Sequence, residues 1–430
     1  FDFIVSELKG AQNDGLLDDA STDKVSGYGR IDKAIAQAFI IEALTYRASW
    51  LFNGECNYYS DLANTDGTKL FPNKPDEATK RANWQKVINE CNTFFSNYGS
   101  RYHLMYTNKD GVSVSGPDSE GFSPTESYRR AVRTLFSEMG NNKEMIFYRL
   151  DNAAGTMQYD RMPNRSGNTT NYRGGSLLGA TQEMVDAYFM SNGESPISGY
   201  SADGVTPIIN EKSDYVEEGV STAEYKGIDG TLYAPVGTRM MYVNREPRFY
   251  ASVHYNGRPV LSAITVDDRN YFSSDKNKDG FGRAEYYYSG SSGAGTQMTD
   301  FTGYNVAKKV STSSSIRNDQ AVYRPYIHIR YAEILLNYME AMNEYNPEDP
   351  KIITYFNEIR ERAGIPNITV TYPQDLGDKE KMREWILRER QIELAFEGDR
   401  FWTLARRLLY EKEENRKIYR MNVLADDQGQ

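Results

Sequence analysis

The sequence is poor in cysteine and histidine, with two and three of these residues among 430. Cys56 and Cys91 are too few for a disulfide framework, and the scattered histidines form no cluster of metal ligands. The chain also lacks any uninterrupted run of about 18 apolar residues, so no segment is typical of a membrane-spanning helix. A disulfide-stapled domain, a zinc site and a helical membrane protein are therefore all disfavoured.

Basic residues are also in deficit, since 50 lysines and arginines face 60 aspartates and glutamates and give a formal net charge of −10. A protein that follows a phosphate backbone carries a basic face, so nucleic acid is an improbable partner. Neither a glycine-rich phosphate loop nor a G-x-S-x-G nucleophile elbow occurs. The residues in excess are aromatic: 33 tyrosines, 18 phenylalanines and 4 tryptophans.

Both ends of the chain carry helical patterns. Apolar and small residues spaced by three and four predict helices over 31–52, 78–97, 327–345 and 350–363, and an amphipathic helix at the very start. Asp349 is placed to cap the last of these helices and Gly364 to end it. Pairs of antiparallel helices cannot bury their stripes alone, so we expect stacked helical hairpins, with 379–413 as a further pair.

The middle of the chain is irregular. Clusters of Gly, Ser, Asn and Asp separate short alternating runs at 240–243, 248–255 and 284–289 that predict strands, and one helix is expected near 181–190. Irregular chain of this length inside a compact protein is more often a site than a scaffold. We therefore expect helices in 1–110, a ligand-binding region with short strands in 111–315, and helices in 316–430.

The segment 382–407 is rich in carboxylates and invites an enzyme interpretation. On a helix, Glu389 and Glu393 fall within the apolar stripe, where acids must be paired or neutralised. Arg388 and Arg390 flank them, and Arg330 or Arg400 could reach them from elsewhere. Acids held ionised by arginines are poor proton donors, so we interpret this pair as structural.

Seven segments resemble, in order, the SusD/RagB family of outer-membrane proteins of Bacteroidetes. They are GRIDKAIAQAFIIEALTYRAS (29–49), EMVDAYFMSNGESPISGY (183–200), NREPRFYASVHYNG (244–257), TGYNVAKKV (302–310), YRPYIHIRYAEILLNYMEAMNE (323–344), FNEIRERAGIP (356–366) and LRERQIELAFEGDRFWTLAR (387–406). The resemblance implies a mainly α fold with a base of tetratricopeptide-like helical hairpins that carries the irregular middle. It also implies a cell-surface lipoprotein that captures glycan, or in some members peptide, for a SusC-like TonB-dependent transporter.

One departure from the family concerns the front of the chain. Nothing here matches the family's signal peptide, its lipobox cysteine or its early helices with a phrase like RAYYYFxLVxxFGDVPL. The opening FDFIVSEL is therefore expected to correspond to a point well inside a full-length member. Lipidation is assigned to no residue of this sequence, and part of the ligand site that the family places early in the chain is expected to be missing.

Aromatic rings offer flat apolar platforms for the C–H faces of sugars, and polar neighbours orient the hydroxyls. The candidate platforms are Tyr271, Phe272, Tyr286, Tyr288 and Tyr304, with Arg269, Asn270 and Arg283 as polar partners. In a strand, alternation would point Tyr286 and Tyr288 the same way and Tyr287 the other way. The competing interpretation is that these tyrosines fill a small β-rich core.

Other aromatic residues carry weaker signals. Trp50, Tyr58 and Tyr59, after the first long helical pattern, form a second candidate cluster. Trp385 and Trp402 lie on helical stripes and are interpreted as core.

One segment resembles a calcium loop. In DKNKDG (275–280), Asp275, Asn277 and Asp279 would supply oxygen ligands, and Gly280 permits the sharp turn. The glutamate expected at position twelve is replaced by Tyr286, and flanking helices are absent, so a surface turn is the alternative. No cofactor is otherwise required. Cys56 and Cys91 are expected to remain free thiols.

The leading hypothesis is thus a non-catalytic protein that captures oligosaccharide. Three alternatives stay open: the same role for oligopeptides, a glycoside hydrolase, and a helical scaffold that binds no small ligand.

Overall fold

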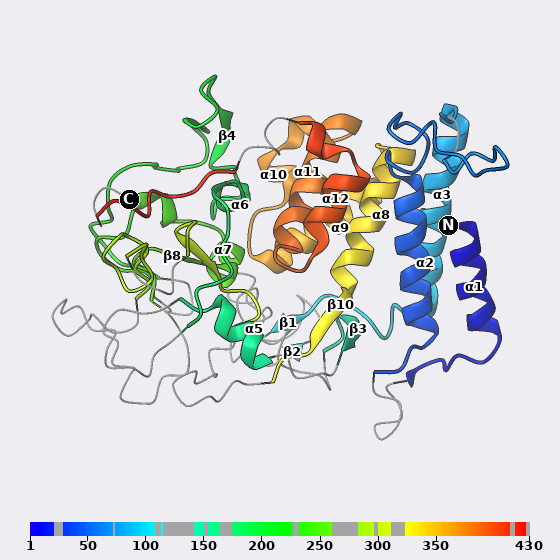
Figure 1. Cartoon of the computed structure of the whole chain (residues 1–430), viewed down its shortest axis with the longest axis horizontal. Coiled ribbons are helices and arrows are strands. Elements are labelled where there is room, and N and C mark those ends of the chain that lie inside the picture. The colour runs from blue at the N-terminus through cyan, green and yellow to red at the C-terminus, as the bar shows by residue number, and fades with distance from the viewer. Residues whose placement is uncertain are drawn as a thin grey trace.

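The computed structural model describes residues 1–20, 29–71, 74–107, 113–114, 142–149, 154–163, 174–226, 232–259, 283–295, 300–310, 323–412 and 418–426. Figure 1 shows a layer of helices on one side and an irregular part on the other. The N-terminus lies beside the helices, whereas the C-terminal segment crosses the irregular part. Within the described ranges, no helix is long and apolar enough to span a bilayer.

Long helices from both ends of the chain form one layer. They are α1 (Asp2–Asn13), α2 (Lys33–Ala48), α3 (Glu77–Tyr98), α8 (Tyr331–Tyr345), α9 (Pro350–Ala363), α11 (Lys379–Glu393) and α12 (Asp399–Arg406), with a short α10 (Ile368–Thr371). Helix α2 packs against α1 and α3, and α8 packs against α3, α9 and α11. The α3–α8 contact joins helices from opposite ends of the chain, so the helical layer is built from both (Figure 1).

Local signals explain where these helices begin and end. The carboxylates of Asp32, Asp76 and Asp349 accept hydrogen bonds from backbone amides in the first turns of α2, α3 and α9. Gly364 ends α9 with φ of 77°, a conformation that side chains disfavour. The sequence predicts two of these signals, Asp349 and Gly364, which together set the bounds of α9.

The irregular part consists of short helices and two-stranded antiparallel ladders. The ladders pair β1 (Tyr106–Thr107) with β2 (Ser113–Val114), β3 (Met145–Arg149) with β10 (Tyr326–Arg330), β4 (Ile197–Tyr200) with β5 (Pro207–Ile209), β6 (Tyr225–Lys226) with β7 (Leu232–Ala234), and β8 (Val253–Tyr255) with β9 (Tyr304–Val306). Between them lie α5 (Ala154–Arg161), α6 (Gln182–Ala187), α7 (Pro247–Ser252) and a 3-10 turn at Met240–Tyr242. Two-stranded ladders are marginal alone, so this part depends on its side-chain contacts.

Tyrosines supply much of that packing. The rings of Tyr233 and Tyr250 stack at a centroid distance of 4.1 Å, and those of Tyr242 and Tyr255 at 4.5 Å. Their hydroxyls are satisfied by backbone: Tyr250 donates to the carbonyl of Tyr242, and Tyr255 to that of Tyr233, each at 2.6 Å. Buried tyrosine is stable only when its hydroxyl finds a partner, which is the case here.

Several predicted elements need correction. The helix expected from residue 327 begins at Tyr331, because 326–330 pairs with β3 as a strand. The strand expected at 240–243 is a 3-10 turn, and 248–255 is divided between α7 and β8. No named strand covers 284–289. At 326–330 long-range pairing overrides the helical spacing, and at 240–243 and 248–252 a turn and a short helix replace the expected strands.

The mainly α class with short strands is confirmed. The pair of helices predicted over 379–413 is confirmed as α11 and α12. Trp385 packs against the core, but Trp402 is 54% exposed, so its assignment to the core was wrong. Cys56 and Cys91 are both free, as predicted. The three-part division of the chain stays a prediction.

Candidate functional site

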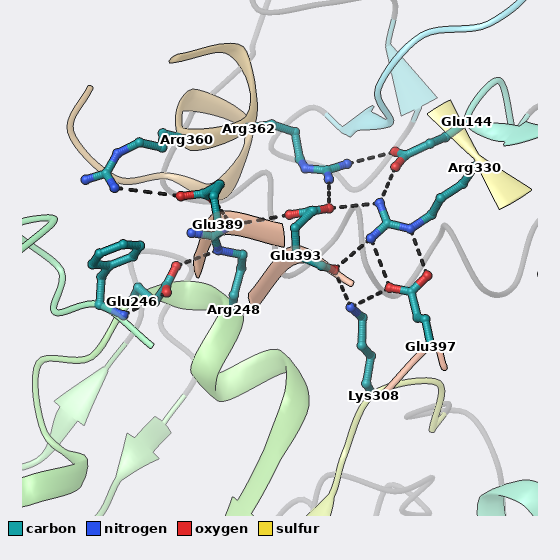
Figure 2. Close-up of polar contacts among 11 residues, drawn as sticks. Glu144, Glu246, Arg248, Lys308, Arg330, Arg360, Arg362, Glu389, Glu393 and Glu397 are labelled. Atoms are coloured by element: carbon teal, nitrogen blue, oxygen red, sulfur yellow. Dashed lines mark hydrogen bonds and ion pairs between the residues drawn. The ribbon is translucent and has the colours of Figure 1, made fainter. Parts of the chain in front are cut away.

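A buried network of charges joins the helical layer to the irregular part (Figure 2). Its five carboxylates and five cations are Glu144, Glu246, Glu389, Glu393, Glu397, Arg248, Lys308, Arg330, Arg360 and Arg362. Their side chains are at most 8% exposed. Equal numbers of opposite charges make the network neutral as a whole, which such burial requires.

Glu393 lies at the centre of this network. It accepts hydrogen bonds from Arg362 and, at 2.8 Å, from Arg330, and it also pairs with Arg248. Burial opposes its ionisation, but the charges of Arg362, Arg330 and Arg248 outweigh burial and hold the pKa of Glu393 well below its usual range. A carboxyl in this state does not donate a proton near neutral pH.

Glu389, one turn earlier, is paired in the same way. It accepts a hydrogen bond from Arg248, and its other oxygen lies 3.8 Å from a guanidinium nitrogen of Arg360. The structural interpretation of both acids is therefore confirmed, although of the expected partners only Arg330 is correct. Arg388 donates instead to backbone carbonyls of α6, and Arg390 pairs with Asp399.

The network fixes the irregular part on its base. Arg248 and Lys308 come from the irregular part, whereas Arg362, Glu389 and Glu393 belong to α9 and α11 (Figure 2). Because each buried charge needs its partners, sliding one part over the other would leave charges uncompensated. The charge network therefore keeps the irregular part, with its surface loops, in one position on the helical layer.

Two of the predicted platforms are not on the surface. Tyr286 and Tyr304 are fully buried, so neither ring face is open to a ligand. The hydroxyl of Tyr286 donates to Asn305 at 2.8 Å, and that of Tyr304 donates to Gln182 at 2.7 Å. For these two residues, the competing interpretation as packing is the correct one.

Tyr288 and Arg283 remain accessible. Tyr288 is 53% exposed, and Arg283 is half-buried at the end of an isolated bridge with Pro259. Tyr286 and Tyr288 do not point the same way, because the chain turns between residues 285 and 295 instead of continuing as a strand. Arg269, Asn270, Tyr271 and Phe272, and the calcium candidates Asp275, Asn277 and Asp279, lie outside the described residues.

Tyr288 is one of five exposed residues, Leu177, Leu178, Tyr288, Phe301 and Arg420, that we refer to together as the Tyr288–Phe301 surface. Phe301 is 64% exposed. The C-terminal segment 418–426 crosses both aromatic loops: Tyr288 N donates to Ala425 O at 2.9 Å, and Arg420 Nη1 donates to Phe301 O at 3.0 Å. The C-terminal segment is thus hydrogen-bonded to the backbone of both residues, and it places Arg420 beside Phe301.

The polypeptide beneath this surface is tightly folded. A Cβ at Gly295 would lie 2.7 Å from the carbonyl oxygen of Tyr288, so glycine is needed where the loop closes on Tyr288. Gly179 is similarly placed against Asp300, 2.8 Å from both carboxylate oxygens. Sequence reasoning missed Phe301, Leu177 and Leu178, because isolated apolar residues in Gly- and Thr-rich loops have no periodicity to reveal their exposure.

A second exposed apolar surface lies on the helical layer. It includes Phe1, Tyr58, Tyr59, Phe401 and Trp402, of which Tyr58 and Tyr59 were predicted as a weaker cluster. Its members are linked through ring contacts, such as Tyr59 with Phe71 at 4.9 Å and Phe401 with Trp402 at 5.1 Å. Trp50 is not exposed with them, since the guanidinium of Arg407 lies 4.5 Å from its ring centre.

Comparison with known proteins defines the class. The SusD family model matches residues 143–429, so the chain belongs to the SusD family. Two curated relatives from Formosa agariphila are SusD-like protein P2, 37% identical over 84 residues, and SusD-like protein P38, 33% identical over 125 residues. These alignments cover 19% and 28% of this chain, and 16% and 23% of the relatives.

Solved structures support the fold. The solved structure of BT4246 superposes with a TM-score of 0.68 at 21% identity, covering 96% of this chain and 66% of that one. The SusD-like protein BF3747 from Bacteroides fragilis gives 0.59 at 23% identity, covering 95% and 60%. The chain thus spans somewhat under two thirds of these relatives, and the similarity establishes the SusD-like fold.

Proposed function

We propose that this protein captures oligosaccharide without cleaving it, at the Tyr288–Phe301 surface, and delivers it to a SusC-like TonB-dependent transporter of the outer membrane. The proposal rests on one observation: Tyr288 and Phe301 have exposed rings, and both residues are hydrogen-bonded to the C-terminal segment 418–426. Membership of the SusD family supports the role of capture.

The chemistry of the surface suits a sugar. Exposed rings match the C–H faces of pyranoses, and Arg420 beside Phe301 can donate hydrogen bonds to ring hydroxyls. Arg283, accessible at the end of its bridge, remains a candidate polar partner. Non-catalytic capture is further supported by Glu389 and Glu393, whose charges are committed to arginines.

The test compares two similarly exposed phenylalanines. Phe301→Ala and Tyr288→Ala should each weaken binding to the preferred glycan roughly 3- to 10-fold, as expected for loss of one ring contact. Phe401→Ala, on the helical layer and 59% exposed, is the matched control and should leave affinity unchanged. Isothermal titration against a glycan panel and a peptide library would measure both.

The alternative functions predict different experimental results. If only the peptides release heat on binding, the ligand is an oligopeptide and not a glycan. Shortened products after long incubation with polysaccharide would indicate a hydrolase. Equal affinities for Phe301→Ala and wild type would remove the Tyr288–Phe301 surface from the proposal.

The partner and the location are part of the same proposal. We place the protein at the cell surface, held by a lipid anchor that is assigned to none of these residues. Retention of a TonB-dependent transporter from solubilised outer membranes on the tagged full-length protein would support this. Calcium at Asp275, Asn277 and Asp279 also stays a proposal, and titration with Ca²⁺ in the presence and absence of EGTA would test it.

A further inference from the structure

One buried side chain, that of Asn305, forms hydrogen bonds to each of the loops that carry the exposed residues of the Tyr288–Phe301 surface. The amide of Asn305, on β9, is fully buried. Its oxygen accepts from the hydroxyls of Ser176 and Tyr286, both at 2.8 Å. Its nitrogen donates to Asp300 Oδ2 at 2.6 Å and to the carbonyl of Leu178 at 3.3 Å.

These four bonds use the full capacity of an amide side chain, which has two donor hydrogens and two acceptor lone pairs. The orientation of the amide is fixed as well, because the Asp300 carboxylate can only accept. A satisfied buried network of this kind specifies one arrangement of the segments that it joins.

The bonded residues are neighbours of the exposed ones. Ser176 precedes Leu177 and Leu178, Tyr286 lies two residues before Tyr288, and Asp300 precedes Phe301. Asp300 also accepts from the amide and the hydroxyl of Thr302, both at 2.6 Å, which closes the turn that presents Phe301. Three separate loops are therefore hydrogen-bonded to the same buried side chain.

We propose that Asn305 is the positioning residue of the ligand-binding surface: through Ser176, Tyr286 and Asp300 it sets the relative placement of the Leu177, Tyr288 and Phe301 side chains. This inference rests on the proposed function for its ligand. Asn305 itself is buried, so it acts through these three loops.

Asn305→Asp tests the role of the amide hydrogens. The new carboxylate keeps the size of the side chain and its acceptor oxygen but faces Asp300 without a donor. Two carboxylates at hydrogen-bond distance repel until they share a proton. At pH 7.5 we expect at least tenfold weaker glycan binding than wild type; at pH 5, where one proton restores the bond to Asp300, the ratio should return to within about threefold.

Other ionisable groups near Asn305 must be separated from this effect. Tyr286 is bonded to it, Arg258 and Tyr242 interact with Tyr286, and His254 is its cross-strand neighbour in the β8–β9 ladder. Burial raises the pKa of Asp300 to about 6 in wild type, so every affinity is compared with wild type at the same pH. Among the described residues, no ion pair joins Asp300 to a cation.

Two further variants serve as comparisons. Tyr286→Phe removes one bond to Asn305 without adding charge, so it should weaken binding by a similar factor at pH 7.5 and pH 5. Asn343→Asp introduces a carboxylate at another buried asparagine, in α8 of the helical layer, and should leave binding unchanged.

Hydrogen exchange gives a readout that needs no ligand. At pH 7.5, Asn305→Asp should speed exchange together in 174–180, 285–292 and 300–306, with α8 and α11 unaffected. If wild type binds no glycan but these segments respond, the proposed function fails and the positioning role stands. Wild-type affinity and exchange for Asn305→Asp at pH 7.5, or a binding defect that persists unchanged at pH 5, would overturn the inference.

Discussion

The helical layer and the irregular part use different chemistry in their interiors. In the helices, buried charges are paired: Glu340 accepts two hydrogen bonds from Arg406 at 2.6 and 2.7 Å, and Glu344 accepts from Arg383 at 2.5 and 2.8 Å. In the irregular part, stacked tyrosines and the Asn305 amide dominate. Ionic pairing makes the base sensitive to acid, whereas tyrosine packing and the Asn305 amide hold the loops of the binding surface.

The largest expected effect comes from breaking the charge network at its centre. Glu393→Gln would leave Arg330, Arg362 and Arg248 short of negative charge, and removing one partner of a buried ion pair costs about 3–5 kcal/mol. Urea unfolding at pH 7 measures the loss. Glu384→Gln, on the exposed face of the same helix, should change stability by less than about 0.5 kcal/mol. Equal effects of the two substitutions would show that the network does not hold the base.

A tryptophan pair sharpens the distinction between buried and exposed helical positions. Trp385 stacks on Tyr372 at 3.9 Å and donates its indole N–H to Asp375 at 2.7 Å. Trp385→Ala should therefore cost roughly 2–3 kcal/mol of unfolding free energy, below the value for a fully buried ring. Trp402→Ala, at an exposed position, should cost less than about 1 kcal/mol. Thermal denaturation of both variants measures the difference, and a larger loss for Trp402→Ala would reverse the assignment.

The helical layer could be predicted from sequence because its signals are local. Asp349, Gly364 and the apolar spacing between them define α9 within 16 positions, and the structure gives Pro350–Ala363. The ionic network could be predicted only as a need for partners. Arg330 and Glu144 are 186 residues apart, and Arg248 and Glu389 are 141 apart, so no pattern in the sequence identifies the pairs.

The irregular part was less predictable for the same reason. Alternation suggested that Tyr286 and Tyr288 share a face, but the turn after residue 285 buries one and exposes the other. Asn305 bonds to Ser176, 129 positions away, and nothing in its neighbourhood marks it as a junction. Phe301 is exposed because its loop is closed by Asp300 and Thr302, which is a consequence of three-dimensional contacts.

The pKa of Glu358, in the helical layer, is raised, whereas that of Glu393 is lowered. Burial, reinforced by Glu144 and only partly offset by Arg362, raises the pKa of Glu358 from 4.5 to about 7. The folded state therefore binds this proton more tightly than the unfolded state, so the stability that Glu358 contributes below pH 4.5 is lost as pH rises through 7.

Glu358→Gln removes this penalty. The variant should match wild type near pH 4.5 and exceed its stability by roughly 1–3 kcal/mol at pH 8, allowing for the partial exposure of the side chain. Urea unfolding at the two pH values gives the comparison, and Glu361→Gln, exposed on the same helix, is the control. A stability gap that is independent of pH would contradict the raised pKa.

The smallest effect concerns a tyrosine that sequence alone placed in the ligand site. The hydroxyl of Tyr304 donates to Gln182 and accepts from Tyr242 at 3.1 Å, so Tyr304→Phe should cost about 1 kcal/mol, the usual net contribution of a hydrogen bond. Because its ring is buried, glycan affinity should not change. Phe301→Ala is the reciprocal case, with weaker binding and nearly unchanged unfolding free energy. If Tyr304→Phe instead lowered glycan affinity at constant stability, Tyr304 would belong to the binding surface. The distinction between tyrosines that pack the interior and loop aromatics that bind ligand would then be wrong.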